Sequence, residues 1–375
     1  MQVAINAQLL SQTASYRGAG VSNYSRHLLK AMGGMAQEAP HLALTAYVNV
    51  PDFTVEGVQF VRSRLPLQQP LARIVWEQSY FPLALQRQGA DVVHGLVNVL
   101  PLATATPGIV TVHDLSFVRM QEKLPAAKRW YLTHLCRASV QKATQVIAVS
   151  RQTADDLIRY FHVAPHKIAI IYNGVAERFQ PHAAATVAEF RRTHQLPARF
   201  LLYVGTLEPR KNLPLLLRAY ARWRRESADH DVALIVAGGK GWFYGEIFQL
   251  VQELGLAAWV HFPGYIPDAE LPAWYNAAEG FIYPSLFEGF GLPVLEAMAC
   301  GTPVICSDIP VLREVAGESA LTFDREDERA LAAQIAALLT EADLRRELIE
   351  KGRAQAHQFS WKASAQATLA LYQGL

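Results

Sequence analysis

Cysteine is scarce in this sequence, and long apolar runs are absent. The three cysteines among 375 residues, Cys136, Cys300 and Cys306, have no metal-binding spacing. We expect reduced core thiols in a cytosolic protein, which excludes a disulfide scaffold. No apolar run approaches the length of a membrane-spanning helix, and the opening MQVAINAQLL reads as a strand without the features of a signal peptide. These absences predict a cytoplasmic globular protein.

Charge is low overall and unevenly divided. Charged residues make up 18% of the chain, and the formal net charge is +2. Residues 1–180 hold 17 Lys and Arg against 10 Asp and Glu, whereas residues 181–375 hold 18 against 23. The basic first half is consistent with ordinary surface scatter, with an anionic acceptor, or with peripheral contact at an anionic inner membrane face.

Short apolar runs alternate with amphipathic stretches along nearly the whole chain, as in strand-helix-strand units with parallel sheets. In the first half we predict strands at Val3–Asn6, Ala43–Asn49, Val58–Val61, Asp91–His94, Gly108–Val112, Gln145–Val149 and Ile168–Ile171. In the second half we predict strands at Phe200–Val204, Val232–Ala237, Trp259–Phe262, Gly280–Tyr283, Pro303–Cys306 and Leu321–Phe323. The predicted helices include Val21–Met32, Arg73–Gln88, Ala126–Lys142, Arg151–Tyr160, Leu213–Arg225, Gly245–Leu254, Asp268–Asn276 and a tail from Glu326.

The two series of strands predict two doubly wound, Rossmann-like α/β domains. A polar, alanine-rich stretch from Arg178 to Val187 separates them, so we place the boundary near residue 180. We predict an N-terminal domain at 1–180, a C-terminal domain at 181–357 and a last helix at 358–375. Two such domains facing one another would form a cleft between the carboxyl ends of both sheets, where these folds bind ligands.

One stretch, Pro284–Asp308, carries the strongest functional pattern. It reads PSLFEGFGLPVLEAMACGTPVICSD and joins a strand end, a glycine-rich loop, a short helix and the next strand. Pro293 suits a first helical turn and Gly301 suits the position after a helix, which predicts a helix of about two turns with its N-terminus at Gly291-Leu292. Free N–H groups and the positive end of the dipole favour an anion there. The stretch therefore predicts a diphosphate pocket.

Two carboxylates, Glu288 and Glu296, flank this pocket. Carboxylates beside an anion site are unfavourable unless the ligand also brings hydroxyl groups, which a carboxylate accepts in pairs. A sugar on one side and a ribose on the other would supply those hydroxyls. Taken alone, Glu296 is equally consistent with a partner of the helix dipole, whereas Glu288 within E-G-F-G fits that role less well.

This stretch strongly resembles the donor-site signature of the retaining glycosyltransferases of family 4, in which two Glu residues separated by seven others bind a nucleotide sugar. The resemblance implies the GT-B fold, with an acceptor-side first domain and a nucleotide-sugar-binding second domain. In that fold the last helix crosses back to the first domain, and Ser360–Gln373 resembles that helix.

The resemblance also assigns roles to residues of the pocket. Glu288 would lie by the transferred sugar and Glu296 on the nucleotide ribose. The donor diphosphate would lie near the backbone amides of Phe290, Gly291 and Leu292.

A second cationic sequence, GTLEPRKN, begins at Gly205. Arg and Lys beside a diphosphate stabilise the negative charge that develops as the nucleotide leaves. The alternative, a basic surface helix start, would be a poor placement for the helix dipole. The family usually has Arg directly after the glycine, where this chain has Thr206. Lys211 matches the family's lysine, and whether Arg210 replaces the missing arginine is left open.

A polar pair follows the predicted strand that ends at Val112. A His at a strand's carboxyl end is placed for ligand contact, and the alternative is a His held by the neighbouring Asp. Family members that resemble this chain often carry H-D-L there, with the His at the transferred sugar, so we predict a catalytic role for His113. Asp114 is expected to orient it or to cap the loop, and His94 is expected to line the acceptor path.

Three further segments carry weaker patterns. In SYRGAGVSN the family's glycine-rich loop assigns Gly18 and Gly20 to the donor phosphate and the acceptor, and Arg17 is placed for an anionic acceptor. By resemblance, Tyr265 and Ile266 border the nucleobase. Asp229-His230-Asp231 has the Asp-x-Asp form of a metal motif but lies in a connection before a strand, so we expect no metal site there.

Together these patterns predict a retaining, metal-independent glycosyltransferase acting on an acceptor hydroxyl. RGAGVSNYSRHLL, TVHDLSF and EGFGLPVLEAM look most like bacterial mannosyltransferases of polysaccharide and lipid-linked glycan assembly. GDP-mannose is therefore the first choice of donor, followed by UDP-glucose or UDP-N-acetylglucosamine. The expected acceptor is a glycan or a polyprenyl-diphosphate-linked glycan, with no nucleic-acid partner and no cofactor beyond the co-substrate.

Two other classes remain as alternatives. An NAD-binding oxidoreductase or epimerase would need a third glycine after Gly20 and an acidic residue at the usual distance, and both are lacking. A non-catalytic carbohydrate-binding subunit would keep the fold without the chemistry. The presence of Glu288, Glu296 and Lys211 argues against it, and Thr206 keeps it open.

Overall fold

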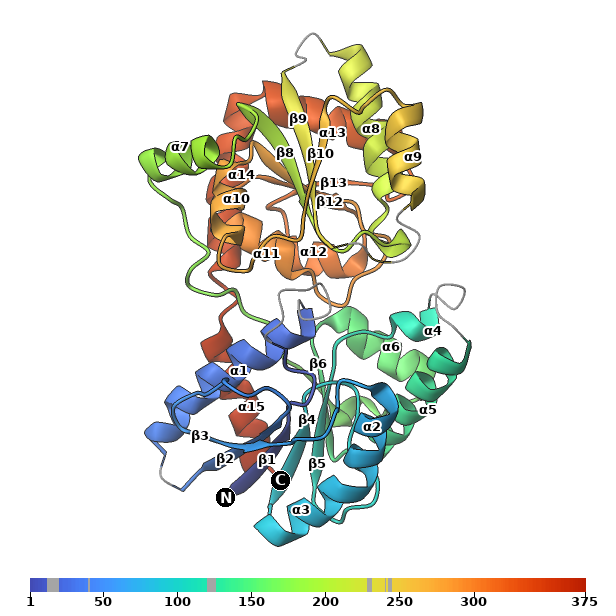
Figure 1. Ribbon diagram of the computed structural model, residues 1–375, viewed down its shortest axis with the longest axis vertical. Helices are drawn as coiled ribbons and strands as arrows, with labels where there is room; N and C mark the ends of the chain where they lie inside the picture. The colour runs from blue at the N-terminus through green and yellow to red at the C-terminus, as the bar shows by residue number, and fades with distance from the viewer. Residues whose placement is uncertain (12–19, 40, 120–125, 228–230, 240, 242–244) are drawn as a thin grey trace. The chain divides into compact units, whose positions relative to one another are not determined.

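The computed structural model describes residues 1–11, 20–39, 41–119, 126–227, 231–239, 241 and 245–375, and of 126–128 it describes the backbone alone. The chain divides into two compact units, each built on its own parallel sheet (Figure 1). The first unit contains the described residues up to Gly174 together with Ser360–Leu375, and the second contains Val175–Phe359.

The first unit has a seven-stranded sheet in the order β3-β2-β1-β4-β5-β6-β7, and every pairing is parallel. The predicted strands of the first half are confirmed, with ends that differ by a residue or so. The strands are β1 (Gln2–Asn6), β2 (Ala43–Val48), β3 (Val58–Arg62), β4 (Val92–Gly95), β5 (Gly108–Val112), β6 (Gln145–Ala148) and β7 (Ile168–Ile170).

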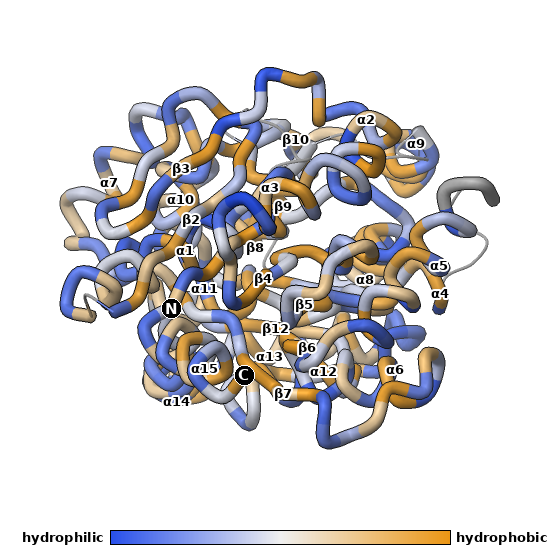
Figure 2. The backbone as a smooth tube through the Cα atoms, turned by 90° about the horizontal axis from the view of Figure 1, so that it is seen from below, coloured by the Kyte–Doolittle hydropathy of each residue, from blue (hydrophilic) through white to orange (hydrophobic). Residues whose placement is uncertain are grey.

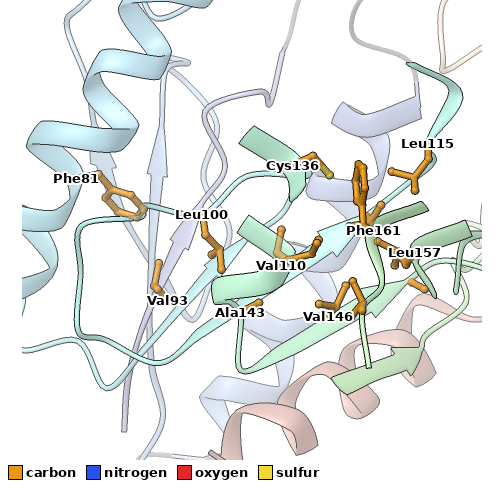
Figure 3. Close-up of a cluster of buried hydrophobic side chains, with 14 of the residues drawn as sticks. Phe81, Val93, Leu100, Val110, Leu115, Cys136, Ala143, Val146, Leu157 and Phe161 are labelled. Atoms are coloured by element: carbon orange, nitrogen blue, oxygen red, sulfur yellow. The ribbon is translucent and has the colours of Figure 1, made fainter. Parts of the chain in front are cut away.

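Alternate residues of these strands face two different helical layers, because successive side chains point to opposite faces of a sheet. One face packs on α3 (Phe81–Gln88), α5 (Ala126–Lys142) and α6 (Arg151–Phe161) and forms the buried cluster in Figure 3, with Val93 and Val110 near Phe81 and Phe161. The other face carries α1 (Gly20–Gln37) and α15 (Trp361–Gln373) (Figure 1). In Figure 2 the strand segments are mostly orange and the outer loops mostly blue, as this two-sided burial requires.

The last helix belongs to the first unit, as predicted for Ser360–Gln373. Ser360 caps α15 by accepting the backbone N–H of Ala363 at 3.1 Å. Ser364 donates its hydroxyl to the carbonyl of Tyr172 at 2.5 Å, and the Trp361 ring stacks on His27 of α1 with centroids 5.4 Å apart. These contacts fix the returning helix on the N-terminal unit.

The second unit has a six-stranded parallel sheet in the order β10-β9-β8-β11-β12-β13. All six predicted strands of the second half are confirmed, and β10 and β12 each end slightly later than expected. The strands are β8 (Arg199–Val204), β9 (Val232–Ala237), β10 (Val260–Gly264), β11 (Gly280–Tyr283), β12 (Val304–Ser307) and β13 (Leu321–Phe323).

The helices of the second unit differ from expectation at three places. α7 occupies part of the stretch interpreted as a connection, because Phe190 packs edge-on against Trp274 and Arg191 bonds backbone carbonyls of Ala198 and Ala277. α12 was not predicted, and the helical tail is divided. The helices are α7 (Ala184–Thr193), α8 (Leu213–Glu226), α9 (Gly245–Glu253), α10 (Leu271–Ala277), α11 (Leu292–Ala299), α12 (Pro310–Ala316), α13 (Glu328–Thr340) and α14 (Ala342–Ala356).

Two sequence expectations about composition can be compared with the structure. Cys136, Cys300 and Cys306 are buried free thiols, as predicted. Among the described residues, no helix combines the length and the apolar character needed to cross a membrane.

Candidate active site

The carboxyl edge of the second sheet is formed by interlocked loops. The backbone N–H of Gly205 donates to Ala237 at 2.9 Å, and that of Gly238 donates to Gly264 at 2.7 Å. Leu207 donates its N–H to Gly239 at 3.0 Å. The loops after β8, β9 and β10 are therefore joined by main-chain hydrogen bonds, and β8 is held in a fixed position relative to its neighbours.

Gly238 is required for this close packing, which leads to a stability prediction. Its φ is +149°, and a Cβ would lie 1.9 Å from the carbonyl oxygen of Gly205. Gly238→Ala is expected to lower the free energy of unfolding by about 2 kcal/mol or more, since the backbone of a packed loop must move. Gly264→Ala is the matched control, because its φ is +82° but nothing lies within 4 Å. Equal effects in urea unfolding would contradict the packing argument.

Three charged side chains meet at this edge. Arg210 and Lys211 lie on the one-turn helix η5 (Pro209–Lys211), directly after the β8 loop, and Glu288 lies on the loop after β11. Lys211 Nζ donates to Glu288 Oε1 at 2.6 Å, and Arg210 NH1 donates to Glu288 Oε2 at 2.7 Å. Both oxygens of one carboxylate are therefore bonded to two consecutive cations, a pairing that the sequence did not predict.

Burial and the neighbouring charges shift the pKa values of Lys211 and Glu288. Lys211 and Glu288 are each 6% exposed. Burial alone would raise the pKa of Glu288, but Arg210 and Lys211 outweigh it and lower that pKa to about 2. Burial lowers the pKa of Lys211, and the Glu288 carboxylate opposes this shift. The cluster is thus an ionised pair with an additional arginine, held largely out of water.

Further partners orient the two cations. Lys211 Nζ donates to the Tyr283 hydroxyl at 2.5 Å, and Arg210 Nε donates to Glu208 Oε1 at 2.8 Å. Arg210 NH1 also donates to the carbonyl of Phe287 at 3.0 Å. Neither Tyr283 nor Glu208 was predicted from the sequence as a site residue. Glu208 stands beside the cations in the sequence, but Tyr283 reads only as the end of an apolar strand.

The predicted short helix is confirmed as α11, with Gly291 at its N-cap. Gly291 has φ +108°, and a Cβ there would lie 2.7 Å from Leu312 Cδ2. Pro293 occupies the first turn, and Leu292 is the first helical residue. The helix begins four residues after Glu288, so the positive end of its dipole follows the charged cluster along the same loop.

Glu296 lies one turn inside α11 and has different surroundings. It is 8% exposed, and Tyr275 donates its hydroxyl to Glu296 Oε2 at 3.0 Å. Burial raises the pKa of Glu296 to about 7. The Tyr275 hydrogen bond and Arg178 lower this pKa, whereas Asp268 raises it further. The two glutamates of the motif therefore differ, one fully ionised and one near its midpoint at neutral pH.

Four more of the predicted donor residues, Thr206, Tyr265, Ile266 and Phe290, occupy the same unit. Thr206 accepts the Tyr203 hydroxyl at its carbonyl at 3.3 Å. Tyr265 directly follows β10 and is half-buried, whereas Ile266 and Phe290 are buried. All of them lie on loops after the strands' carboxyl ends or at the start of α11, which agrees with a common site at this edge.

His113 lies at the carboxyl end of β5 in the first unit. Its Nε2 bonds the carbonyl of Leu96 at 2.8 Å, so Nε2 carries the hydrogen and Nδ1 the lone pair in the neutral ring. The Tyr24 ring contacts it edge-on with centroids 4.5 Å apart. Burial lowers the pKa of His113, opposed by the Leu96 bond and Asp114, so the ring is neutral at physiological pH. A neutral, oriented imidazole is suited to hydrogen bonding with a substrate.

His94, expected on the acceptor path, is fully buried beneath the last helix. Its Nδ1 bonds the Tyr372 hydroxyl at 2.6 Å, and its Nε2 bonds Thr111 Oγ1 at 2.9 Å. Both ring nitrogens are occupied, and the structure does not place His94 where an acceptor can reach it. Val93 faces the other side of the sheet, so His94 faces α15. The hydrogen bond to Tyr372 of α15 makes His94 a structural residue.

Asp114 acts as the loop cap that was expected of it. Its Oδ1 accepts the backbone N–H of Ser116, the first residue of α4 (Ser116–Arg119), at 2.8 Å. Gly20 is the first residue of α1, whereas Arg17 and Gly18 lie outside the described residues.

The Asp-x-Asp motif can be examined only in part, because Asp229 and His230 also lie outside the described residues. Within the part of the chain that is described, no group of three or more His, Cys, Asp or Glu side chains is arranged to hold a metal ion.

These features define a class of protein. The two Rossmann-like units form a GT-B scaffold, and a cationic cluster, a carboxylate and a helix N-terminus lie at one sheet edge, where such folds bind ligands. The chain belongs to the glycosyltransferases: the model "Glycosyl transferases group 1" matches residues 187–355, and "Glycosyltransferase Family 4" matches residues 18–179. The resemblance carried by Pro284–Asp308 is thereby confirmed, and with it an enzyme of the transferase class.

Several curated relatives are named mannosyltransferases. O-antigen chain mannosyltransferase B of Escherichia coli is 35% identical over 265 residues, covering 70% of this chain and 69% of that protein. MMP alpha-(1->4)-mannosyltransferase of Mycolicibacterium hassiacum is 31% identical, covering 78% and 72%. Serotype-specific mannosyltransferase WbdA of Escherichia coli is 30% identical, and the match covers 68% of this chain but only 32% of WbdA.

Solved structures share the whole fold. Sucrose-phosphate synthase of Thermosynechococcus elongatus has a TM-score of 0.81 and 25% identity, covering all of this chain and 98% of that one. WaaG, a glycosyltransferase involved in lipopolysaccharide biosynthesis, has a TM-score of 0.77 at 18% identity over the full length of both chains. The predicted GT-B architecture is confirmed by these neighbours.

Proposed function

We propose that this protein is a retaining, metal-independent mannosyltransferase that uses GDP-mannose. The observation that carries the proposal is the cluster of Arg210, Lys211 and Glu288 beside the N-terminus of α11. Two cations and the positive end of the α11 dipole supply the positive environment that a departing nucleoside diphosphate needs. The named mannosyltransferase relatives support mannose as the transferred sugar.

Binding of the donor would replace the contacts that Arg210, Lys211 and Glu288 make with one another. Its diphosphate would bind Arg210, Lys211 and the amides of Phe290, Gly291 and Leu292. Glu288 would then accept hydroxyl hydrogen bonds from the sugar and orient it. Glu296 would accept the ribose hydroxyls, and Thr206, Tyr265 and Ile266 would border the nucleotide.

Transfer would occur on one face of the sugar. The acceptor oxygen bonds to the anomeric carbon on the face from which the diphosphate leaves, and the acceptor proton passes to the leaving phosphate oxygen. This gives retention without a protein nucleophile, so Glu288 orients the sugar and does not attack it. His113 would hydrogen-bond the transferred sugar through its neutral ring.

The acceptor would be a hydroxyl of a glycan, either free or linked to a polyprenyl diphosphate. The assembly of O-antigen named for one relative supports a glycan acceptor. An acceptor carried on a membrane lipid would require the enzyme to work at the cytoplasmic membrane surface.

A product assay tests the proposal. The enzyme is incubated in EDTA with GDP-mannose, UDP-glucose or UDP-N-acetylglucosamine and a mannose-terminated oligosaccharide, and the new linkage is examined by NMR. We expect an α-linked mannose from GDP-mannose alone, matching the configuration of the donor. A β-linked product or loss of activity in EDTA would refute retention or metal independence, and transfer only from a UDP-sugar would replace the donor.

Glu296 gives this proposal a pH dependence. Its pKa in the free protein is about 7, and only the carboxylate accepts both ribose hydroxyls. GDP-mannose affinity is expected to rise as pH increases from 6 to 8, by up to about tenfold per unit below the pKa. In Glu296→Gln this dependence should be flat when measured by calorimetry. A wild-type affinity that falls with rising pH would contradict the ribose role.

A further inference from the structure

A helical run on the first unit exposes an unusual number of large apolar side chains. α2 (Pro70–Val75), the π-helical turn η2 (Trp76–Tyr80) and α3 follow one another without interruption (Figure 1). Leu71 is 78% exposed, Val75 64%, Tyr80 50% and Leu83 52%. We call these four residues the apolar stripe. A contiguous exposed apolar area of this kind typically marks an interaction site.

The π-helical turn places these residues on one side of the run. The N–H of Phe81 donates to the carbonyl of Trp76, five residues earlier, and the two rings stack inward with centroids 5.0 Å apart. Val75 and Tyr80 are also five residues apart and share the outer side. In a regular α-helix, at about 100° per residue, their side chains would point in directions roughly 140° apart around the helix axis. The turn therefore orients Trp76 and Phe81 to the core and keeps the stripe continuous.

The neighbouring loop extends the same surface. The backbone N–H of Leu102 donates to Gln78 Oε1 at 2.9 Å, and Gln78 Nε2 donates to the carbonyl of Leu100 at 3.0 Å. Leu102 is 36% exposed and is held beside the π-helical turn by these bonds. The stripe is thus bordered by another apolar side chain on a fixed loop.

The exposed charges within the segment that carries the stripe are of one sign. From Gly57 to Ala90 the sequence has four arginines and one acid, Glu77. Glu77 is 5% exposed and faces inward, where it accepts from Asn6 at 2.9 Å. Arg87 is exposed on α3, and exposed Arg62 and Arg64 precede the run. Within the described stretch from Gly57 to Ala90 no exposed carboxylate is present, and the exposed acids Glu56 and Asp91 stand at its two ends.

We propose that the apolar stripe is a membrane-docking surface for a bilayer with anionic headgroups. Apolar side chains enter the headgroup boundary, arginines pair with lipid phosphates, and an exposed Tyr suits the interface. A second copy of the chain fits less well, because a symmetric contact would oppose arginines to arginines without carboxylates. The choice of a membrane as the partner rests on the proposed lipid-linked acceptor. The apolar stripe itself is observed independently of that proposal.

Vesicle flotation tests the proposal without donor or acceptor, so its outcome is independent of transferase activity. The protein is floated with phosphatidylcholine vesicles, with and without phosphatidylglycerol. We expect flotation that needs phosphatidylglycerol and decreases with salt. Leu71→Ser/Leu83→Ser should reduce binding by about tenfold or more, while transfer to a soluble glycan is unchanged.

Matched controls locate the surface. Ile158→Ser/Ile170→Ser changes two apolar residues, 38% and 42% exposed, on α6 and β7, and should bind as the wild type does. Arg87→Glu should weaken binding to anionic vesicles, and Arg346→Glu on α14 should not. Failure of the wild type to float, equal flotation of the stripe variants, or a dimer in light scattering that these variants dissolve would overturn the proposal.

Discussion

Lys211→Ala is expected to reduce turnover by two or more orders of magnitude while the protein stays folded. Lys211 is buried against Glu288 and Tyr283, where its charge would act on the leaving diphosphate of the proposed donor with little screening by water. Loss of one such group typically costs about 100-fold to 1,000-fold in rate. Stability should change less, because Arg210 still pairs with Glu288 at 2.7 Å.

Steady-state kinetics and thermal unfolding check this result together. Lys351→Ala is the control, because Lys351 forms only an exposed helical pair with Glu347, and it should retain wild-type turnover. Lys211→Met separates loss of charge from loss of volume and should be as slow as Lys211→Ala. A Lys211→Met enzyme with near-normal turnover would exclude a catalytic role for the charge.

Glu288→Ala is expected to be similarly inactive and more damaging to the fold. The substitution leaves Lys211 buried with the Tyr283 hydroxyl as its remaining partner of those described, and breaking a buried pair in this way costs about 3–5 kcal/mol. Glu288→Gln keeps the side-chain volume and should lose turnover with a smaller loss of stability. Near-normal rates for Glu288→Gln, with Glu246→Gln on exposed α9 as the control, would refute the donor role.

The acid stability of the protein provides an independent readout for Glu288. Its folded pKa of about 2 lies below the ordinary value near 4.3. The carboxylate therefore stabilises the fold fully above the ordinary value, and this contribution is lost as pH falls toward 2. Urea unfolding between pH 5 and 3 should show a shallower loss in Glu288→Gln than in the wild type.

Much of the fold could be predicted from the sequence because it depends on local patterns. Parallel strands buried on both faces appear as short apolar runs. Ser150 directly precedes the predicted helix Arg151–Tyr160 and is a residue type favoured at helix N-caps, and it accepts the backbone N–H of Thr153 at 3.1 Å. α7 could not be recognised in this way, because it has no buried residue and is held by α10. The π-helical turn at Trp76–Tyr80 likewise depends on packing against the sheet.

The residues of the candidate site that belong to a local sequence motif could be predicted, but their pairing in space could not. Lys211 and Glu288 were identified in separate motifs, and the structure brings them to 2.6 Å because β8 and β11 are neighbours in the sheet. Tyr275 and Tyr283 were missed, since a Tyr in an apolar run reads as core. His94 was predicted as a site residue but is not one, because Tyr372 of the returning α15 covers it and bonds its Nδ1.

The central claim is that the carboxyl edge of the second sheet binds the diphosphate of the donor. Calorimetric titration of GDP into the wild type and Lys211→Ala, in EDTA, tests it most directly. We expect one GDP site per chain and an affinity at least about tenfold lower in the variant, because a charged contact to phosphate is lost. Unchanged GDP affinity in Lys211→Ala, or no binding of GDP or UDP by the wild type, would contradict it.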